Sequence, residues 1–182
     1  MSPRPLLLAA AAAVLVSALP GAASAASTDD LLAPAAACPG QSDASAPVAA
    51  QEATMSCMVN FARRGAGLHG LRRNRLLTLA ATRKARDVIA CRQFSHTACG
   101  RPFATRISQA GYRYRAAGEN LAMGDGPSGA PREVMRAWLD SSGHRSNLLR
   151  PIYRDQGIAL RVGDMPGYPH ALVWVNEFGV RG

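Results

Sequence analysis

One stretch near the C-terminus decides the fold class: Gly157-Ile158-Ala159-Leu160-Arg161-Val162, then Gly163-Asp164-Met165-Pro166-Gly167, then Ala171-Leu172-Val173-Trp174-Val175-Asn176-Glu177-Phe178. The first and third segments are rich in β-branched and aromatic residues, and the segment between them carries the glycine and proline of a turn. This pattern predicts an antiparallel hairpin with strands at 157–162 and 171–178. Residues 119–123 are a candidate for another strand.

Upstream of the hairpin, apolar residues recur at helical spacing. The pattern predicts helices over residues 52–68 and 76–93, a third helix that Pro102 opens and Gly111 ends, and a fourth that begins after Pro131. The fourth is expected to stop at the break Ser141-Ser142-Gly143. Helices followed by a hairpin indicate an α+β domain in which apolar helix stripes cover a small sheet.

The N-terminus has the features of a secretory signal peptide. Arg4 precedes an apolar run from Leu6 to Leu19, and the small residues Ala23-Ser24-Ala25 follow. A membrane anchor is the alternative, but the run is shorter than the ~20 residues that a span needs. We therefore expect cleavage after Ala25 and export, a flexible Ala/Ser/Pro-rich lead-in over residues 26–50, and one folded domain over residues 51–182, with no transmembrane segment after cleavage.

The formal net charge is +9, and Lys84 is the one lysine in the chain. Such a surface favours anionic partners, for example a component of the cell envelope, through attraction that salt weakens. The plainer explanation is a GC-rich coding sequence, which produces arginine in place of lysine. The arginines look scattered and no aromatic residues interleave with them, so the pattern does not favour nucleic acid. We expect a monomer.

Four cysteines in an exported chain indicate disulfides. Local pairing, Cys38 with Cys57 and Cys91 with Cys99, is the simplest of the three possible connectivities. The second bridge would fix the loop that holds His96. Two alternatives remain: Cys91, His96 and Cys99 as a zinc site, or one free cysteine as a nucleophile with His144 as its base.

His96, Glu119 and His144 are candidate site residues because imidazoles and carboxylates bind divalent metals or move protons near neutral pH. Each also has a structural explanation. His96 could bond a neighbouring carbonyl, Glu119 could accept N–H groups in a tight turn, and His144 could contact the carbonyl end of a helix. Ser141 is interpreted as a helix end, and Trp138 as a core residue.

Catalytic templates are mostly missing from the sequence: it has no Gly-x-Ser-x-Gly elbow, no His-Glu-x-x-His and no phosphate-binding glycine loop. Ser141 or Ser142 with His144 as base would be poorly placed for the required hydrogen bond. The sequence therefore favours a binding protein over an enzyme.

The order of several short motifs nevertheless resembles a known family. The motifs span residues 54–179 and are Asn60-x-x-Arg63, Gly67-Leu68, Leu71-x-x-Asn74-x-x-Leu77, Phe94-Ser95-His96, Gly111-Tyr112, Gly118-Glu119-Asn120, Trp138-x-x-Ser141-x-Gly143-His144-Arg145-x-Asn147-Leu148-Leu149 and Gly157-Ile158-Ala159. The chain resembles the CAP superfamily of cysteine-rich secretory, antigen 5 and pathogenesis-related proteins, in its bacterial SCP-like extracellular branch.

The resemblance implies a three-layer α-β-α sandwich with a small antiparallel central sheet and a cleft that holds a His-Glu tetrad. His96, Glu119 and His144 match three of its members, whereas the second glutamate is replaced by Ser141. Asp140 cannot be assumed to substitute, because one residue along a helix turns the side chain by about 100°. Two imidazoles and one carboxylate could still hold Zn²⁺ or another divalent cation.

The expected function is that of a secreted CAP-domain protein whose cleft, lined by His96, Glu119, Ser141 and His144, binds a divalent metal ion or a small ligand such as a lipid or cell-wall component. One alternative is a peptidase-like hydrolase that uses Glu119 or an imidazole as general base. The other is a basic structural or adhesive envelope protein without activity.

Overall fold

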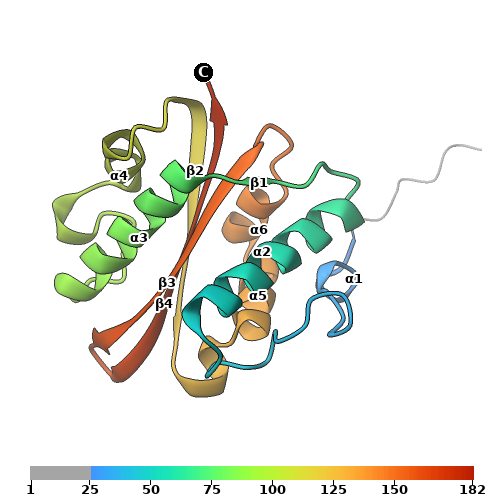
Figure 1. Ribbon diagram of the computed structural model, residues 1–182, viewed down its shortest axis with the longest axis horizontal. Helices are drawn as coiled ribbons and strands as arrows, with labels where there is room; N and C mark the ends of the chain where they lie inside the picture. The colour runs from blue at the N-terminus through green and yellow to red at the C-terminus, as the bar shows by residue number, and fades with distance from the viewer. Residues whose placement is uncertain (1–25) are drawn as a thin grey trace, which may run out of the picture.

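A four-stranded sheet separates two helical layers, as the computed structural model shows (Figure 1). It describes residues 26–182, and the predicted signal peptide at 1–25 lies outside the described residues. The elements in chain order are α1 (Thr28–Leu31), α2 (Val48–Gly65), β1 (Arg72–Arg73), α3 (Arg75–Ala90), η1 (Ala98–Gly100), α4 (Phe103–Gln109), β2 (Tyr114–Gly124), η2 (Gly126–Gly129), α5 (Pro131–Asp140), α6 (Ser142–Leu148), β3 (Asp155–Met165) and β4 (Tyr168–Arg181). The α+β sandwich is confirmed.

The sheet has the strand order β1-β3-β4-β2. The predicted hairpin is confirmed as β3 and β4, which pair antiparallel, and the candidate strand at 119–123 is the middle of β2, which pairs antiparallel with β4. The sequence pattern did not predict β1, a two-residue strand that runs parallel to β3. Two residues are too few to show any period.

The two helical layers bury opposite faces of the sheet because successive side chains of a strand alternate. On β4, Trp174 and Phe178 point into the layer that holds α1, α2, α5 and α6. Val173 and Val175 point to α3 on the other face. Trp138 of α5 is 1% exposed, which confirms it as a core residue.

Helix α3 lies unusually close to the sheet. A Cβ added to Gly157 of β3 would lie 2.1 Å from both the carbonyl carbon of Leu77 and the amide nitrogen of Thr78. Only glycine fits there, since real atoms do not approach so closely. Helix α3 begins on a side-chain cap, in which Asn74 accepts from the backbone of Leu76.

The lead-in at residues 26–50 differs from the expectation. Leu31 is fully buried and Leu32 is 5% exposed, and both belong to the core against α2. Helix α1 starts at a capping box between Ser27 and Asp30. The stretch has too few apolar residues to show a period, yet tertiary contacts and a bridge from Cys38 hold it on the domain.

The break at Ser141-Ser142-Gly143 is a change of helix direction, because Ser141 ends α5 and immediately precedes α6. Ser141 as a helix end is thus confirmed, whereas α6 itself was not predicted. Its seven residues contain a single buried side chain, Leu148, which gives no amphipathic pattern.

Both predicted disulfides are present. Cys38 pairs with Cys57, and Cys91 with Cys99, with Cα atoms 5.8 and 5.5 Å apart. Because no cysteine is free, the cysteine-containing zinc site and the cysteine nucleophile are both wrong. Among the described residues, no helix has the length and apolar character needed to cross a membrane.

Candidate functional site

The candidate site is built around two consecutive polar residues of β2. Glu119 and Asn120 are both buried, and they lie opposite Glu177 and Asn176 of β4. Since neighbouring side chains of a strand alternate, Glu119 points to the α3 face and Asn120 to the α6 face. The tight turn considered for Glu119 is wrong, because this residue lies in the middle of an eleven-residue strand.

On the α3 face, His96 contacts Glu119. Its Nδ1 lies 2.7 Å from Glu119 Oε1, and the side chains are 53% and 0% exposed. An ionised carboxylate can only accept, so Nδ1–H donates to it and Nε2 is the free nitrogen of the ring. A half-exposed imidazole is therefore oriented by a wholly buried partner.

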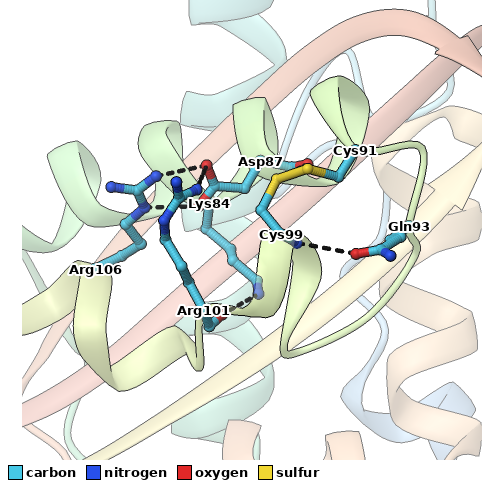
Figure 2. Close-up of a disulfide and its surroundings, with 7 residues drawn as sticks. All are labelled: Lys84, Asp87, Cys91, Gln93, Cys99, Arg101 and Arg106. Atoms are coloured by element: carbon cyan, nitrogen blue, oxygen red, sulfur yellow. Dashed lines mark hydrogen bonds and ion pairs between the residues drawn. A yellow bond between two sulfur atoms is a disulfide. The ribbon is translucent and has the colours of Figure 1, made fainter.

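The loop that carries His96 is fixed to the end of α3 (Figure 2). The Cys91–Cys99 bridge closes the loop, and the amide of Cys99 donates to Gln93 Oε1 at 2.9 Å. Arg92 and Cys99 have φ values of 52° and 57°, in the left-handed region that side chains rarely adopt. The covalent bridge holds a backbone path that loop contacts alone would hold poorly.

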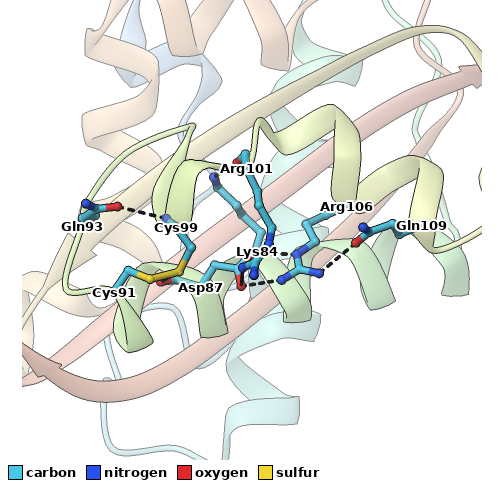
Figure 3. A network of polar contacts seen from close by, with 8 residues as sticks. All are labelled: Lys84, Asp87, Cys91, Gln93, Cys99, Arg101, Arg106 and Gln109. Atoms are coloured by element: carbon cyan, nitrogen blue, oxygen red, sulfur yellow. Dashed lines mark hydrogen bonds and ion pairs between the residues drawn. A yellow bond between two sulfur atoms is a disulfide. The ribbon is translucent and has the colours of Figure 1, made fainter.

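A second set of contacts fixes the segment after this loop (Figure 3). Asp87 of α3 accepts from Arg106 Nε at 2.6 Å and from Arg101 Nη1 at 3.1 Å, and Arg106 also donates to Gln109. The hydrogen bonds that Arg106 donates to Asp87 raise the pKa of Arg106. Lys84 donates to the carbonyl oxygen of Arg101 at 3.4 Å. The segment 99–109 is therefore attached to α3 both by the disulfide at Cys99 and by the contacts of Arg101 and Arg106.

Glu177 lies beside Glu119 and is fully buried. Within residues 26–182, neither of its carboxylate oxygens has a hydrogen-bond partner. Burial, and next the negative charge of Glu119, raise the pKa of Glu177 well above its usual range. Burial also lowers the pKa of the nearby Lys84, an effect that the two carboxylates oppose. Glu119 and Glu177 thus lie side by side behind His96.

On the α6 face, neutral hydrogen bonds replace charges. Asn120 Nδ2 donates to the carbonyl oxygen of His144 at 3.0 Å, and Asn147 Nδ2 donates to Asn120 Oδ1 at 3.0 Å and to the Glu119 carbonyl at 3.1 Å. These bonds attach α6 to the middle of β2.

His144 Nδ1 lies 2.9 Å from Ser141 Oγ. The expectation that these two side chains are poorly placed for a hydrogen bond is wrong, because the turn between α5 and α6 brings them together. Burial lowers the pKa of His144, and the charge of His96 lowers it further. His96 and His144 thus lie within electrostatic reach, and with Glu119 and Ser141 they form what we call the histidine site.

Asp140 does not replace the second glutamate of the tetrad. Its Oδ1 accepts from Thr28 Oγ1 of α1 at 2.6 Å, at an exposed position outside the histidine site. The buried acid that was not predicted from the sequence is Glu177, and its only signal was a carboxylate in the run Ala171–Phe178, in which Asn176 is the one other polar residue. Lys84 and Asn147 were missed as well, because their contacts cross between elements.

The histidine site does not fit a divalent metal in this geometry. Among residues 26–182, no three His, Cys, Asp or Glu side chains gather as a metal-binding group. His96 and Glu119 point at each other, and His144 turns its Nδ1 to Ser141. Metal binding stays a prediction of the sequence.

Residues 58–178 match the family described as "Cysteine-rich secretory protein family", or CAP. The chain belongs to this family. A relative from Bacillus subtilis, the uncharacterized protein YkwD, is 32% identical to this CAP protein over 151 residues. The match covers 80% of this chain and 54% of YkwD, so the chain spans about half the length of that relative.

Two solved structures share the fold of this CAP domain. An extracellular protein of Bacillus anthracis that contains an SCP domain has a TM-score of 0.61 at 22% identity, over 74% of this chain and 41% of that protein. An outer surface protein of Borrelia burgdorferi also has a TM-score of 0.61 at 22% identity, over 70% of this chain and 90% of that protein. Both are described as lying outside the cell or at its surface.

Proposed function

We propose that this CAP domain is secreted and acts as a binding module whose ligand is a small polar fragment of the cell wall, held between His96 and His144. The observation that carries the proposal is the 2.7 Å contact between the half-exposed His96 and the buried Glu119. A side chain fixed by a buried partner is oriented before the ligand arrives, which lowers the ordering cost of binding.

A ligand rich in hydroxyl and amide groups suits this site best. His96 donates its Nδ1–H to Glu119 in a hydrogen bond. In the neutral ring, Nε2 is then free to accept a hydrogen bond from a hydroxyl or amide group of the ligand. Burial lowers the pKa of His144, which favours its neutral form. Fragments of wall glycan with short peptide stems carry both kinds of donor.

Calorimetry on the mature chain, residues 26–182, tests the proposal with soluble disaccharide-peptide fragments of wall glycan. His96→Ala and His144→Ala should each weaken binding by at least about tenfold. His69→Ala and His170→Ala are matched controls, because both histidines are exposed and lie outside the histidine site. Equal affinities for all four variants and the wild type would contradict the proposal.

The same proteins also test the metal prediction, with Zn²⁺ alone as the titrant. The prediction of a zinc site requires that His96→Ala and His144→Ala reduce the heat of binding, while the control variants do not. Heats that cannot be told apart across the series would remove it.

A second candidate function, a hydrolase, is favoured by the same short contact. A buried carboxylate that fixes Nδ1–H leaves Nε2 to take a proton from water, which is how many general bases are oriented. Turnover of peptide, ester or wall substrates should then disappear in Glu119→Gln while the unfolding midpoint stays close to that of the wild type. Unchanged turnover, or none in the wild type, would exclude this candidate.

A further inference from the structure

Six of the arginines that look scattered along the chain lie at one end of the sheet. β1, β2 and β3 begin at this end, near the top of the view in Figure 1, and β4 ends there beside the C-terminus. Six arginines lie on or next to these strand ends and are all exposed, and we call them the sheet-end arginines: Arg72, Arg73, Arg113, Arg115, Arg154 and Arg181.

Hydrogen bonds and strand register connect them across the full width of the sheet. The amide of Arg72 donates to the Arg154 carbonyl, and the amide of Arg154 donates to the Gly179 carbonyl. Arg181 lies opposite Tyr114, which stands between Arg113 and Arg115. Four strands at the usual spacing span roughly 14 Å, so the six arginines lie along one end of the sheet.

These charges are mostly free of carboxylate partners. Asp155 pairs with Arg72, and its side chain is only 3% exposed. Among the described residues, none of the other five sheet-end arginines has a carboxylate within ion-pair distance. Four arginines elsewhere are paired with acids: Arg101 and Arg106 with Asp87, Arg136 with Asp29, and Arg161 with Glu52. The edge is therefore a concentrated patch of positive charge.

A hollow of about 630 Å³ adjoins this edge, lined by Ser108, Gly111, Tyr112, Arg113 and Tyr114. Arg181 lies over the Tyr112 ring at 5.4 Å from its centre. The hydroxyl of Tyr112 donates to Asp155 at 2.7 Å, which fixes the ring beneath that guanidinium. The patch thus has both charge and a recess in which a chain unit can lie.

We propose that the sheet-end arginines bind a phosphodiester-linked anionic polymer of the cell wall, and that this surface acts independently of the histidine site. Guanidinium groups bind phosphate oxygens through two parallel hydrogen bonds, and they bind carboxylates in the same way, so the comparison with polygalacturonate in the test below decides between the two. Charges spread across the roughly 14 Å width of the sheet suit an extended polymer chain. Binding to such a polymer would retain the domain at the cell wall.

Two other anionic partners fit this surface less well. Binding of single-stranded nucleic acid uses several exposed aromatic side chains on which bases stack. The patch offers only the half-buried Tyr114. Proteins bind a membrane surface through apolar side chains that insert among the lipids. The exposed large apolar residues of the described chain all lie outside these strand ends, and they are Val48, Leu79, Phe94, Val162 and Tyr168.

The experiment measures binding of the mature chain to poly(glycerol phosphate) at several salt concentrations. The test variant is Arg113→Gln with Arg115→Gln. The control, Arg86→Gln with Arg92→Gln, removes the same charge from exposed positions on α3 and just after it. The test variant should bind about tenfold more weakly, and its slope of log Kd against log salt should fall by about one for each lost contact. The control should change neither value by more than about twofold.

Three results would overturn the inference: no binding of poly(glycerol phosphate) by the wild type, equal weakening in both variants, or tighter binding of a single-stranded oligonucleotide or of polygalacturonate. His96→Ala should leave this binding unchanged. A loss there would merge the surface with the histidine site and contradict their independence. Because calorimetry with glycan fragments is a separate readout, failure of one proposal can be told apart from failure of the other.

Discussion

The two faces of β2 hold their histidines by different physical means. On the α3 face, His96 depends on a buried carboxylate that lies beside a second buried acid and Lys84. On the α6 face, Asn120 and Asn147 attach the helix of His144 through uncharged hydrogen bonds. One strand can therefore place two imidazoles at one site with a pH-sensitive support on one side and a pH-insensitive support on the other.

The largest expected effect tests how closely each helical layer approaches the sheet. Gly157→Ala would place a Cβ 2.1 Å from the backbone of α3, which cannot move without moving the helix. We expect it to destabilise the domain by more than about 3 kcal/mol. Gly118→Ala meets only the ends of Tyr153 and Asn147, on the α6 face, and should cost about 1 to 3 kcal/mol.

Gly143→Ala is the control for this pair, because a Cβ there has no heavy atom within 4 Å. It should leave stability unchanged or raise it by about 0.5 to 1 kcal/mol, as expected for alanine replacing glycine in a helix. Chemical unfolding measures all three variants. Equal losses for Gly157→Ala and Gly118→Ala would show that the two layers approach the sheet alike.

A smaller effect distinguishes the charged face from the neutral one. The pKa of Glu177 is raised in the folded chain, so the folded state keeps a proton that the unfolded chain releases above about pH 4.5. Its contribution to stability is therefore lost as pH rises above that value, by up to about 1.4 kcal/mol per pH unit. Glu177→Gln should remove this slope and be more stable than the wild type near pH 7.

Asn147→Ala is the matched change on the neutral face. It leaves Asn120 Oδ1 without its donor and should cost about 1 to 3 kcal/mol at every pH between 5 and 8. Urea unfolding of both variants across this range makes the comparison. If the stability of Glu177→Gln falls with pH as steeply as that of the wild type, Glu177 does not have a raised pKa in the folded chain.

The sequence predicted the parts of the fold that repeat a local pattern. Helical period identified α3, alternation identified β3 and β4, and cysteine spacing identified both bridges. The missed elements are short: α1, β1 and α6 contain too few residues for a period. For the candidate site, motif order indicated His96 and His144, whereas Glu177 is buried by packing that no local pattern records.

The gathering of the sheet-end arginines could not be predicted for a related reason. Arg72 and Arg181 are far apart in sequence, and only the strand order β1-β3-β4-β2 brings their strand ends to one edge. Charge along the sequence gives the sign and size of the attraction, and topology decides where it is concentrated.

The most direct test of the account asks whether His96 and His144 share one site. Their ring protons can be followed by NMR as pH is lowered, in the wild type and in His96→Ala. A shared site predicts that the pKa of His144 lies below its ordinary value in the wild type, and that it moves upward in His96→Ala because a neighbouring positive charge has been removed. An unchanged midpoint for His144 would place the two rings in separate environments and contradict a shared histidine site.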